Sequence, residues 1–480
     1  MGKTSVFVGE KLLEAEARCG LFALKVNNIC LWQYVRYTCM VKILEEITGV
    51  ETVCRGMSAV RKQKTQWEFK EWLKHQQFLA HKKDILVLNH PRRVKEGRYY
   101  RCFVTDWILE NLEYSYYVYE SEYGGMHYTP VRTRHLKYVN VDSIRKLVKY
   151  DEQRYKKELS DFVNKVICAF EGYCQVTLSA ALKQFLCSHI FNAYRELFYD
   201  RIWAGLVLKL VRPRLVIVTV GYSFFVQVMV AEAKRLRIPT VELQHARIGD
   251  THLAYNYIYR GEIESFCDYM FVYGAYDKTA ARYPILADHV IAVGYPELER
   301  KARCYVTNKI KKQTKNRRKV ITFLSAPGPG EIILKYALEL RKKEELKNYR
   351  MIFKLHPCEY RDWKAWYPQL EHSGLEIVSD NQHDIYYYLG HSDYVVGISS
   401  TALFEAMEFD TQIFVIKDGD YRKAEYLYQN SNACLVETVE QLVEGLLITN
   451  DKNLEKKDNK YFTTNSIQNI QKQIERLIKN

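Results

Sequence analysis

Short apolar runs alternate with longer amphipathic stretches along most of the chain. The clearest example is an apolar run at residues 215–220, a turn at 221–223, an amphipathic stretch at 224–237 and a second apolar run from Ile238. A buried parallel strand shows as a continuous apolar run, and a helix as apolar positions repeating every 3.6 residues. The pattern therefore predicts a β-α-β unit. Although residues 215–231 carry no charge, polar residues interrupt them and the period changes, so we expect no membrane span here.

The first 300 residues contain further runs of this kind around a long helical region. Apolar runs at residues 5–9, 85–90, 268–274 and 291–296 predict strands. Residues 142–210 are rich in Lys, Tyr and Leu at helical spacing. We therefore expect a mixed α/β domain with helical insertions.

A basic segment precedes a second alternating series. Residues 309–319 contain seven basic residues and no acidic residue, which is typical of a linker or a surface loop. After it, strands are predicted at residues 320–325, 350–357, 375–380, 393–400 and 411–416, with helices at 331–347 and from Thr401. Strands separated by helices predict a second doubly wound parallel sheet. The predicted fold class is thus α/β with two Rossmann-like domains, residues 1–305 and 320–460, that face each other across a cleft. An amphipathic helix within residues 461–480 is expected to pack back on the first domain.

Composition narrows the class of protein. The 480 residues are 48% hydrophobic and 27% charged, which excludes a mainly disordered chain, and the formal net charge is 71 − 57 = +14. The 12 cysteines are scattered without a C-x-x-C pair, so we expect neither a disulfide scaffold nor a cysteine-based metal site. The first ten residues carry one basic residue and no apolar core, so no secretory signal is expected. These features predict a cytoplasmic protein.

The densest group of candidate residues follows the predicted strand at 238–243. The segment QHARIGDTH contains His245, Arg247 and His252. Histidine suits general-base chemistry because its ordinary pKa lies near neutral pH, so we favour His245 as a base and His252 as an assisting residue. The alternative is that His245 is a hydrogen-bonded structural residue.

Three further groups point to an anion. In FKLHP, Lys354 and His356 alternate along a predicted strand, so they are expected to share a face and contact a phosphate. In GISSTALFEA, the segment from Ser399 to Thr401 opens a helix, where backbone N–H groups and hydroxyls favour anions, and Glu405 could accept hydrogen bonds from ribose. The alternatives are a solvated strand edge for the first group and an ordinary helix cap for the second.

The turn after the first strand of the second domain is rich in glycine. In SAPGPG, glycines such as Gly328 allow the backbone to approach a ligand beside Ser325, although an ordinary β-α turn has the same pattern. The segment DGD at 418–420 follows a late strand and is interpreted as a turn, so no metal site is predicted.

Several motifs in this order resemble a known family. The motifs are IPTVELQHARIGDTH (238–252), VGYPELE (293–299), FKLHP (353–357) and GISSTALFEA (397–406), together with NNICLWQYVR (27–36) and LNHPRR (88–93). They resemble bacterial capsule and surface-polysaccharide glycosyltransferases of the GT-B fold. FKLHP and GISSTALFEA are similar to the HP and SS motifs of bacterial sialyltransferases and of CDP-glycerol glycerophosphotransferases.

The resemblance implies a role for each domain. In the C-terminal domain, His356 and Ser399, Ser400 and Thr401 would hold the donor nucleotide and its phosphates, and in the N-terminal domain His245 would act as the base on the acceptor hydroxyl. To the donor site we add Ser325, Gly328, Lys354 and Glu405 from the residues themselves, and as acceptor contacts Arg247, His252, Arg92, Arg93 and Tyr222. Ala246 stands where the family pattern has glycine, and the acidic pair followed by glycine that supplies the sialyltransferase base is missing, which argues against a sialic acid donor.

The resemblance and the residues together predict a metal-independent glycosyltransferase that extends a capsular or other surface polysaccharide, with inversion at the anomeric carbon. CMP, CDP or UDP is the expected donor nucleotide, and the acceptor is expected to be an acidic or lipid-linked glycan. The positive charge favours peripheral contact with an anionic inner membrane, and no nucleic-acid partner is expected. The alternatives are a CDP-glycerol-type glycerophosphotransferase, a UDP-sugar 2-epimerase-like enzyme, and a basic non-enzymatic binder of membranes or nucleic acid.

Overall fold

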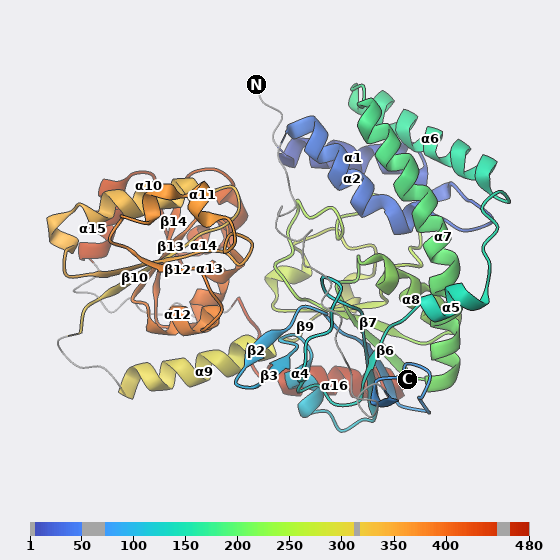
Figure 1. Cartoon of the computed structure of the whole chain (residues 1–480). Helices are drawn as coiled ribbons and strands as arrows, with labels where there is room; N and C mark the ends of the chain where they lie inside the picture. The colour runs from blue at the N-terminus through green and yellow to red at the C-terminus, as the bar shows by residue number, and fades with distance from the viewer. Residues whose placement is uncertain (1–4, 50–72, 312–316, 449–460, 480) are drawn as a thin grey trace. The chain divides into compact units, whose positions relative to one another are not determined.

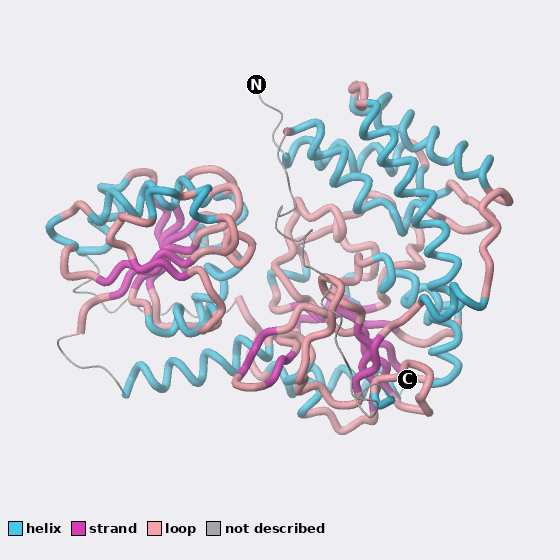
Figure 2. The backbone as a smooth tube through the Cα atoms, in the orientation of Figure 1, coloured by secondary structure: helices cyan, strands magenta, loops and turns pink. Residues whose placement is uncertain are grey.

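The computed structural model describes residues 5–49, 73–311, 317–448 and 461–479. These residues fall into two compact units, each built around one parallel sheet (Figures 1 and 2). Unit 1 contains residues 5–49, 73–294 and 465–479, and unit 2 contains residues 295–311, 317–448 and 461–464. Each unit is described by itself below.

The sheet of unit 1 has the order β5-β4-β1-β6-β7-β8-β9 in the described part of the chain, and every neighbouring pair is parallel. Its strands are β1 (Ile85–Leu88), β4 (Tyr116–Glu120), β5 (Leu136–Tyr138), β6 (Leu215–Thr219), β7 (Thr240–Leu243), β8 (Tyr269–Val272) and β9 (Val290–Ala292). The chain order reverses between β1 and β6. Open α/β sheets bind ligands beyond the carboxyl ends of their strands at such a switch point.

Helices cover both faces of this sheet because its strands are apolar on both sides. One face packs against α4 and α16, and the opposite face packs against α5, α7 and α8. A further layer of α1, α2 and α6 packs against α7 and shares a core with it. The helices of unit 1 are α1 (Ser5–Arg18), α2 (Trp32–Thr48), α4 (Asp106–Glu110), α5 (Asp142–Leu147), α6 (Lys156–Cys174), α7 (Ala180–Val211), α8 (Phe224–Arg235) and α16 (Ser466–Lys479).

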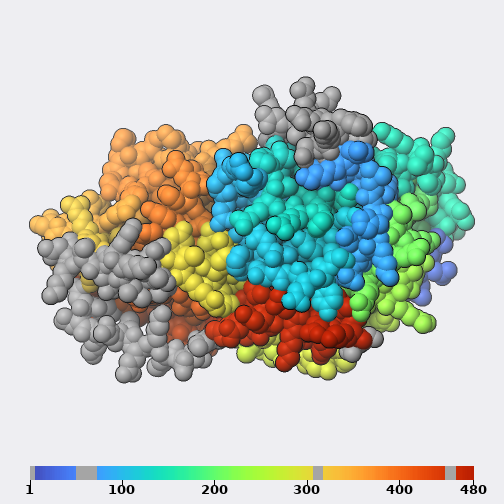
Figure 3. All heavy atoms as spheres, turned by 90° about the horizontal axis from the view of Figure 1, so that it is seen from below, coloured from blue at the N-terminus to red at the C-terminus, as the bar shows by residue number. Residues whose placement is uncertain are grey.

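Helix α16 lies on unit 1 although it comes last in the sequence. Its apolar side buries Ile470 and Ile474 against the sheet. Asn469 Nδ2 donates to the carbonyl of Val293 at 3.2 Å, and Arg214 donates to the carbonyl of Ile478 at 2.6 Å. In Figure 3 the helix forms a red strip along the surface beside the blue and cyan segments of unit 1. A small antiparallel pair, β2 (Val94–Glu96) and β3 (Tyr99–Arg101), completes the described strands of this unit.

The sheet of unit 2 has the order β12-β11-β10-β13-β14-β15 across the described residues, again entirely parallel. This is the strand order of dinucleotide-binding Rossmann domains, with the switch point between β10 and β13. The strands are β10 (Val320–Leu324), β11 (Arg350–Lys354), β12 (Glu376–Val378), β13 (Tyr394–Gly397), β14 (Gln412–Ile416) and β15 (Cys434–Val436).

Helices α10 and α15 cover one face of the unit 2 sheet, and α12 contributes to the core on the other. The helices of this unit are α9 (Pro296–Lys311), α10 (Gly330–Arg341), α11 (Trp363–Trp366), α12 (Ile385–His391), α13 (Thr401–Glu405), α14 (Glu425–Gln429) and α15 (Val439–Ile448).

Most strands lie where the apolar runs predict them, but three predictions are wrong. Residues 5–9 form the first turns of α1 and not a strand, because Val8, Leu12 and Ala15 continue as one buried helical face. The predicted helix at 331–347 ends at Arg341. The basic segment 309–319 is not a loop throughout, since α9 continues to Lys311; residues 312–316 lie outside the described part. Five strands, β2, β3, β4, β5 and β15, have no counterpart in the sequence prediction.

Two observations concern the cysteines and the helices of the described residues. None of the described cysteines forms a disulfide. None of the described helices combines the length and the apolar composition that crossing a membrane requires. The uncharged stretch at 215–231 is strand β6 followed by a turn and the beginning of α8, as its change of period predicts.

Candidate active site

Three loops at the carboxyl edge of the unit 1 sheet bring imidazole and phenol rings together. His90 follows β1, Tyr222 follows β6 and His245 follows β7. The ring centroids of His90 and His245 are 5.8 Å apart, and Tyr222 Oη lies 3.5 Å from His245 Nε2. Strands β1 and β6 flank the switch point, and β7 is next to β6. The rings therefore gather where a ligand site is expected.

His252 joins the same cluster from further along the loop after β7. Its ring centroid is 5.4 Å from that of Tyr222 and 6.0 Å from that of Tyr37, against which it stacks at 15°. Tyr37 comes from α2 and also lies 4.8 Å from Tyr222. The structure thus unites three predicted residues, His245, His252 and Tyr222. It adds His90 and Tyr37, which the sequence analysis did not select.

Burial keeps these imidazoles neutral. Burial, together with the neighbouring imidazoles of His90 and His252, lowers the pKa of His245 to about 3. Burial and the Arg92 guanidinium lower the pKa of His90 to about 4, and burial lowers that of His252 to about 4. At neutral pH all three rings are in the form that can accept a proton. The Nδ1 atom of His245 is buried and has no hydrogen-bond partner among the described residues.

A buried carboxylate supports the turn that carries Tyr222. The backbone N–H of Gly221 donates to Glu242 Oε1 at 2.8 Å, and a Cβ atom on residue 221 would lie 2.0 Å from Glu242 Oε2. Tyr255 Oη also donates to Glu242 Oε1, at 2.5 Å. The preceding residue, Val220, has a φ of 53°, which is rare for a β-branched residue. Such unfavourable backbone at a strand end is typical of functional sites.

The loop that carries His245 and His252 is fixed at both ends. At its start, Gln244 is 3% exposed, accepts from the N–H of Tyr273 at 2.7 Å and donates to the carbonyl of Ala246 at 3.0 Å. Beyond His252, the buried Arg36 of α2 donates to the carbonyl of Leu253 at 2.8 Å while Glu16 of α1 pairs with its guanidinium at 2.6 Å. The imidazoles therefore sit on a rigid frame.

The predicted arginines differ in environment. The guanidinium of Arg93 is fully buried, binds Glu120 at 2.6 Å and donates to Thr133 Oγ1 at 2.8 Å. This favours a structural role for Arg93. Arg92 is exposed, and its backbone N–H donates to His90 Nδ1 at 3.0 Å. Arg247 is half-buried in the loop after β7. Arg92 and Arg247 are therefore the better placed of the three for an anionic ligand.

In unit 2 a single carboxylate joins two of the predicted donor-binding loops. Glu359 is fully buried and accepts from Ser325 Oγ at 3.0 Å, from the backbone N–H of His356 at 2.6 Å and from Tyr367 Oη at 2.6 Å. Ser325 follows β10, and His356 follows β11. Glu359 therefore fixes both loops at the carboxyl edge of the sheet, next to the switch point.

Lys354 and His356 do not alternate along one strand, contrary to the sequence prediction. Strand β11 ends at Lys354, because the chain turns where Glu359 binds the N–H of His356. The Lys354 side chain is only 6% exposed; its Nζ donates to the carbonyl of Leu355 at 3.1 Å and contacts Tyr360 Oη. Burial lowers the pKa of Lys354 to about 8. The Lys354 ammonium is thus bound by Leu355 and Tyr360 of the same segment.

The segment from Ser399 to Thr401 follows β13, the strand across the switch point from β10. Ser400 Oγ accepts from the N–H of Ala402 at 3.3 Å, which is the cap that the alternative interpretation predicts. Helix α13 has only five residues and ends at Glu405, whose pKa is raised to about 7 by burial and by Asp384. The hydroxyls of Ser399 and Thr401 lie at the same sheet edge as Ser325 and His356.

In the glycine-rich turn after β10, the backbone conformation requires glycine at position 328. Gly328 has a φ of 93°, and a Cβ there would meet nothing within 4 Å, so backbone conformation and not space explains the glycine. The turn leads directly into α10, which begins at Gly330.

Three of the four residues that the sequence analysis did not select carry a signal in the sequence. Glu242 is a carboxylate inside an apolar strand, and such a residue has to be paired when the strand is buried. Glu359 lies three residues beyond His356, within reach of a turn that closes on it. His90 stands in the quoted LNHPRR motif. Only Tyr37 gave no signal, because its role depends on the packing of α2.

No group of three or more His, Cys, Asp or Glu side chains within the described ranges is placed to hold a metal ion. The DGD segment follows β14 as a turn in which Asp418 Oδ1 accepts from the N–H of Gly419 at 2.6 Å.

Neither a protein-family model nor a curated protein matches the sequence. Solved structures do match. UDP-GlcNAc 2-epimerase from Neisseria meningitidis, bound to UDP-GlcNAc, is 14% identical, with 82% of this chain and 99% of that chain covered and a TM-score of 0.50. The wall teichoic acid polymerase TagF is 13% identical over 85% of this chain and 92% of that chain, with a TM-score of 0.47. MurG from Acinetobacter baumannii is 10% identical over 82% of this chain and 99% of that chain, with a TM-score of 0.44.

At 14% identity the likeness to the epimerase concerns the fold alone, and the two likenesses with TM-scores below 0.5 carry no argument. The likeness to the epimerase, together with the Rossmann strand order of both parallel sheets, confirms the predicted fold class, which is α/β of the GT-B type with two Rossmann-like domains.

Proposed function

We propose that the protein is a metal-independent glycosyltransferase that moves a sugar from a nucleotide donor to a growing capsular or other surface polysaccharide. The observation that carries the proposal is the cluster of neutral imidazoles around Tyr222 at the switch point of unit 1. A transferase needs a proton acceptor beside the acceptor hydroxyl, and this cluster offers a buried one on a rigid loop.

His245 acts as the base in this proposal. The acceptor oxygen attacks the anomeric carbon and gives its proton to a ring nitrogen of His245, while the bond from that carbon to the phosphate oxygen breaks and the nucleotide leaves with the electron pair. A low pKa makes an isolated His245 a weak base. The negative charge of a bound donor raises this pKa toward neutrality and favours transfer of the proton. A single displacement of this kind inverts the anomeric carbon.

Unit 2 holds the donor. Ser325, Gly328 and His356 lie in loops fixed at the carboxyl edge of its sheet, and the hydroxyls of Ser399 and Thr401 lie at the neighbouring strand end. These groups, with Ser400, Lys354 and Glu405 behind them, would bind the nucleotide and stabilise the departing phosphate. Arg92, Arg247, His252 and Tyr222 would contact an acidic or lipid-linked acceptor. The expected site of action is the cytoplasmic face of the plasma membrane.

The first experiment is thermal unfolding with CMP, CDP, UDP, GDP and TDP, each with magnesium and with a chelator. Selective binding raises the melting temperature by mass action. We expect one nucleotide to stabilise the protein equally under both conditions. No shift with any nucleotide would contradict the proposal.

The alternatives predict different products. An epimerase would convert a UDP-sugar with no acceptor present, and a glycerophosphotransferase would act only with CDP-glycerol. A non-enzymatic binder would attach to anionic vesicles or nucleic acid in a salt-sensitive way and ignore free nucleotides.

A further inference from the structure

A hollow outside the candidate active site lies in unit 1, between α7, the loop at residues 149–155 and the segment at residues 27–29. Its volume is about 370 Å³, within the range of roughly 300–1,000 Å³ that ligand pockets occupy. The lining is mostly aromatic, with Tyr150, Tyr155, Tyr194 and Phe198. It also carries three cations, Lys149, Arg154 and Arg201, and one carboxylate, Asp151. None of these residues has a part in the site described above.

The aromatic side chains that line the hollow pack against one another. Tyr150 lies 5.6 Å from Phe198 and 6.3 Å from Tyr194, and Tyr155 lies 5.6 Å from Tyr194, measured between ring centroids. Tyr150, Tyr155 and Phe198 are only half-buried, so part of each ring is open to the hollow. Rings of this kind offer an apolar surface next to a polar group, which suits a sugar ring.

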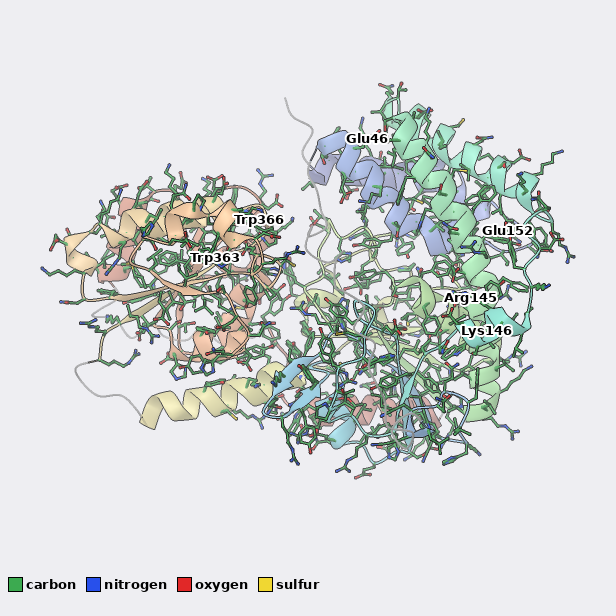
Figure 4. All side chains as sticks on the ribbon, viewed as in Figure 1. Glu46, Arg145, Lys146, Glu152, Trp363 and Trp366 are labelled. Atoms are coloured by element: carbon green, nitrogen blue, oxygen red, sulfur yellow. The ribbon has the colours of Figure 1, made fainter. Side chains whose placement is uncertain are left out.

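Of the three cations, Arg201 pairs with Glu232 at 2.8 Å, and the other two have no carboxylate partner within the described residues. Lys149 and Arg154 are both exposed. The Arg154 guanidinium lies over the Tyr155 ring at 5.2 Å. Figure 4 shows Arg145 and Lys146 of α5 and Glu152 of the following loop beside α7; Arg145 is paired with Glu196, and Glu152 with Arg195, so neither adds to the unpaired charge. Unpaired cations beside half-open rings favour a ligand that carries carboxylate or phosphate groups.

A second hollow of about 280 Å³ shares Ile29 and Arg201 with the first, and the two together are called the groove. The second hollow is lined by three carboxylates, Glu232, Glu262 and Glu264, beside Lys234 and Arg235, so the acidic groups of a ligand are expected at Lys149 and Arg154 in the first hollow. Tyr34 of α2 lines the second hollow, and Tyr37, three residues further along the same helix, stacks on His252 in the imidazole cluster. Residues three apart on a helix are neighbours, so about one turn of α2 separates this groove from the cluster.

We propose that the groove binds an acidic oligosaccharide, namely the part of the acceptor that lies beyond the sugar at the reacting end. This inference rests on the proposed glycosyltransferase function. The rings would stack on sugar faces, while Lys149 and Arg154 bind acidic groups. Such a site would retain a growing chain between additions.

Binding of labelled oligosaccharides to the full chain tests the proposal by fluorescence anisotropy. The probes are a hyaluronan octasaccharide and an α2,8-linked sialic acid octamer, with maltooctaose as the neutral control. The double variant Lys149→Glu/Arg154→Glu should weaken binding of an acidic probe at least about tenfold. The matched control, Lys165→Glu/Lys209→Glu, reverses two exposed lysines of unit 1 outside the groove and should bind as the unaltered protein does. Tyr155→Leu should weaken binding without changing the charge.

Three results would overturn the proposal: no binding of either acidic probe, equal binding of maltooctaose, or equal loss in the groove and control variants. The nucleotide-induced shift in melting temperature is measured on the same variants to separate this proposal from the proposed function. A preserved nucleotide shift with unchanged oligosaccharide binding rejects the groove and leaves the transferase. Loss of oligosaccharide binding in a protein that no nucleotide stabilises supports a glycan site and rejects the transferase.

Discussion

The two parallel sheets reverse their strand order in the same way, yet the loops at their switch points differ in chemistry. In unit 1 these loops carry imidazoles and phenols that burial keeps neutral, around Tyr222 and His245. In unit 2 they carry hydroxyls and one histidine, whose loops are tied together by Glu359. The shared topology thus indicates where a ligand could bind in each unit, and the loop composition indicates which chemistry suits each place. Neutral imidazoles suit proton transfer, whereas ordered hydroxyl and N–H groups suit the binding of phosphate.

A buried carboxylate supports the loops in both units. Glu242 accepts from the N–H of Gly221 and from Tyr255, and Glu359 accepts from Ser325, His356 and Tyr367. Neither is paired with a cation through the hydrogen bonds described. Each carboxylate therefore depends on a complete set of donors, and each is a sensitive point of its unit.

Replacing His245 in unit 1 and His356 in unit 2 should separate the proton transfer from donor binding. The largest expected effect is the loss of turnover on replacing His245. If His245 is the base, His245→Gln should lower turnover by about 10²–10⁴-fold, because general-base catalysis contributes that much. Nucleotide affinity should change little. His356→Gln should do the opposite and weaken nucleotide binding about tenfold while turnover at saturating donor stays close to normal. Steady-state kinetics and titration calorimetry measure both quantities.

The control for both variants is His372→Gln, at an exposed histidine of unit 2. Equal losses of turnover and nucleotide affinity in His245→Gln would contradict its role as base.

The pH dependence of kcat/KM provides a second test of His245. Because the pKa of His245 is about 3, kcat/KM should not fall between pH 7 and pH 5 on account of this residue. An ordinary histidine would lose about tenfold per pH unit below 6.5.

The buried carboxylate of unit 1 should make that unit less stable as the pH rises. Burial raises the pKa of Glu242 from 4.5 to about 7 in the folded protein. The folded state therefore holds the proton more tightly than the unfolded state. The free energy of unfolding is highest below pH 4.5, falls as the pH rises to about 7, and loses about 3 kcal/mol in total from this group. Glu242→Gln should remove this slope.

Hydrogen exchange of β6 and β7 amides, corrected for intrinsic rates, measures the effect in unit 1 alone. Glu405 has a similarly raised pKa in unit 2, so Glu405→Gln should flatten the profile of β13 and leave that of β7 unchanged. A slope in β7 that survives Glu242→Gln would show that another group causes it. The buried histidines act in the opposite direction, with stability lost below pH 6.5, and they cancel when variant and unaltered protein are compared.

The carboxylate of unit 2 should matter for both stability and donor binding. Glu359→Ala leaves the Ser325 and Tyr367 hydroxyls and the His356 N–H without their acceptor, which should cost unit 2 roughly 1–3 kcal/mol. The released loops should also reduce the thermal shift produced by the nucleotide. Exchange of β10 and β11 amides measures the first effect. Glu344→Ala, at a carboxylate whose side chain is 84% exposed, is the control and should change neither.

The strands of both sheets were predictable because each apolar run has to be buried, and its end marks the edge where a site can form. Strands β6, β7, β10 and β13 lie where their runs predict them. Their order in the sheet was predictable in outline from the alternation of strands and helices. Helix α1 was missed because five residues cannot distinguish a strand from the start of a helix.

Contacts between distant parts of the chain were not predictable. Arg92 and Arg93 are neighbours of the same type, yet only Arg93 reaches the buried Glu120. Tyr37 contacts Tyr222 across 185 positions of sequence (222 − 37 = 185), and no local pattern records that contact. Burial decides the pKa of His245, and burial is a property of the packed unit and not of the motif.

The smallest expected change in stability concerns Ser400, for which the cap and the phosphate contact make different predictions. Ser400 Oγ accepts from the N–H of Ala402, so Ser400→Ala should cost unit 2 about 1 kcal/mol. Aspartate is an equally good cap, so Ser400→Asp should preserve stability. A carboxylate at this position would repel a phosphate, and nucleotide affinity should fall about tenfold or more if the donor binds at this strand end. An Asp variant with full stability and weakened nucleotide binding would place the donor phosphate beside β13. An Asp variant with unchanged affinity would leave Ser400 a cap, and the donor site would then rest on the loops that Glu359 joins.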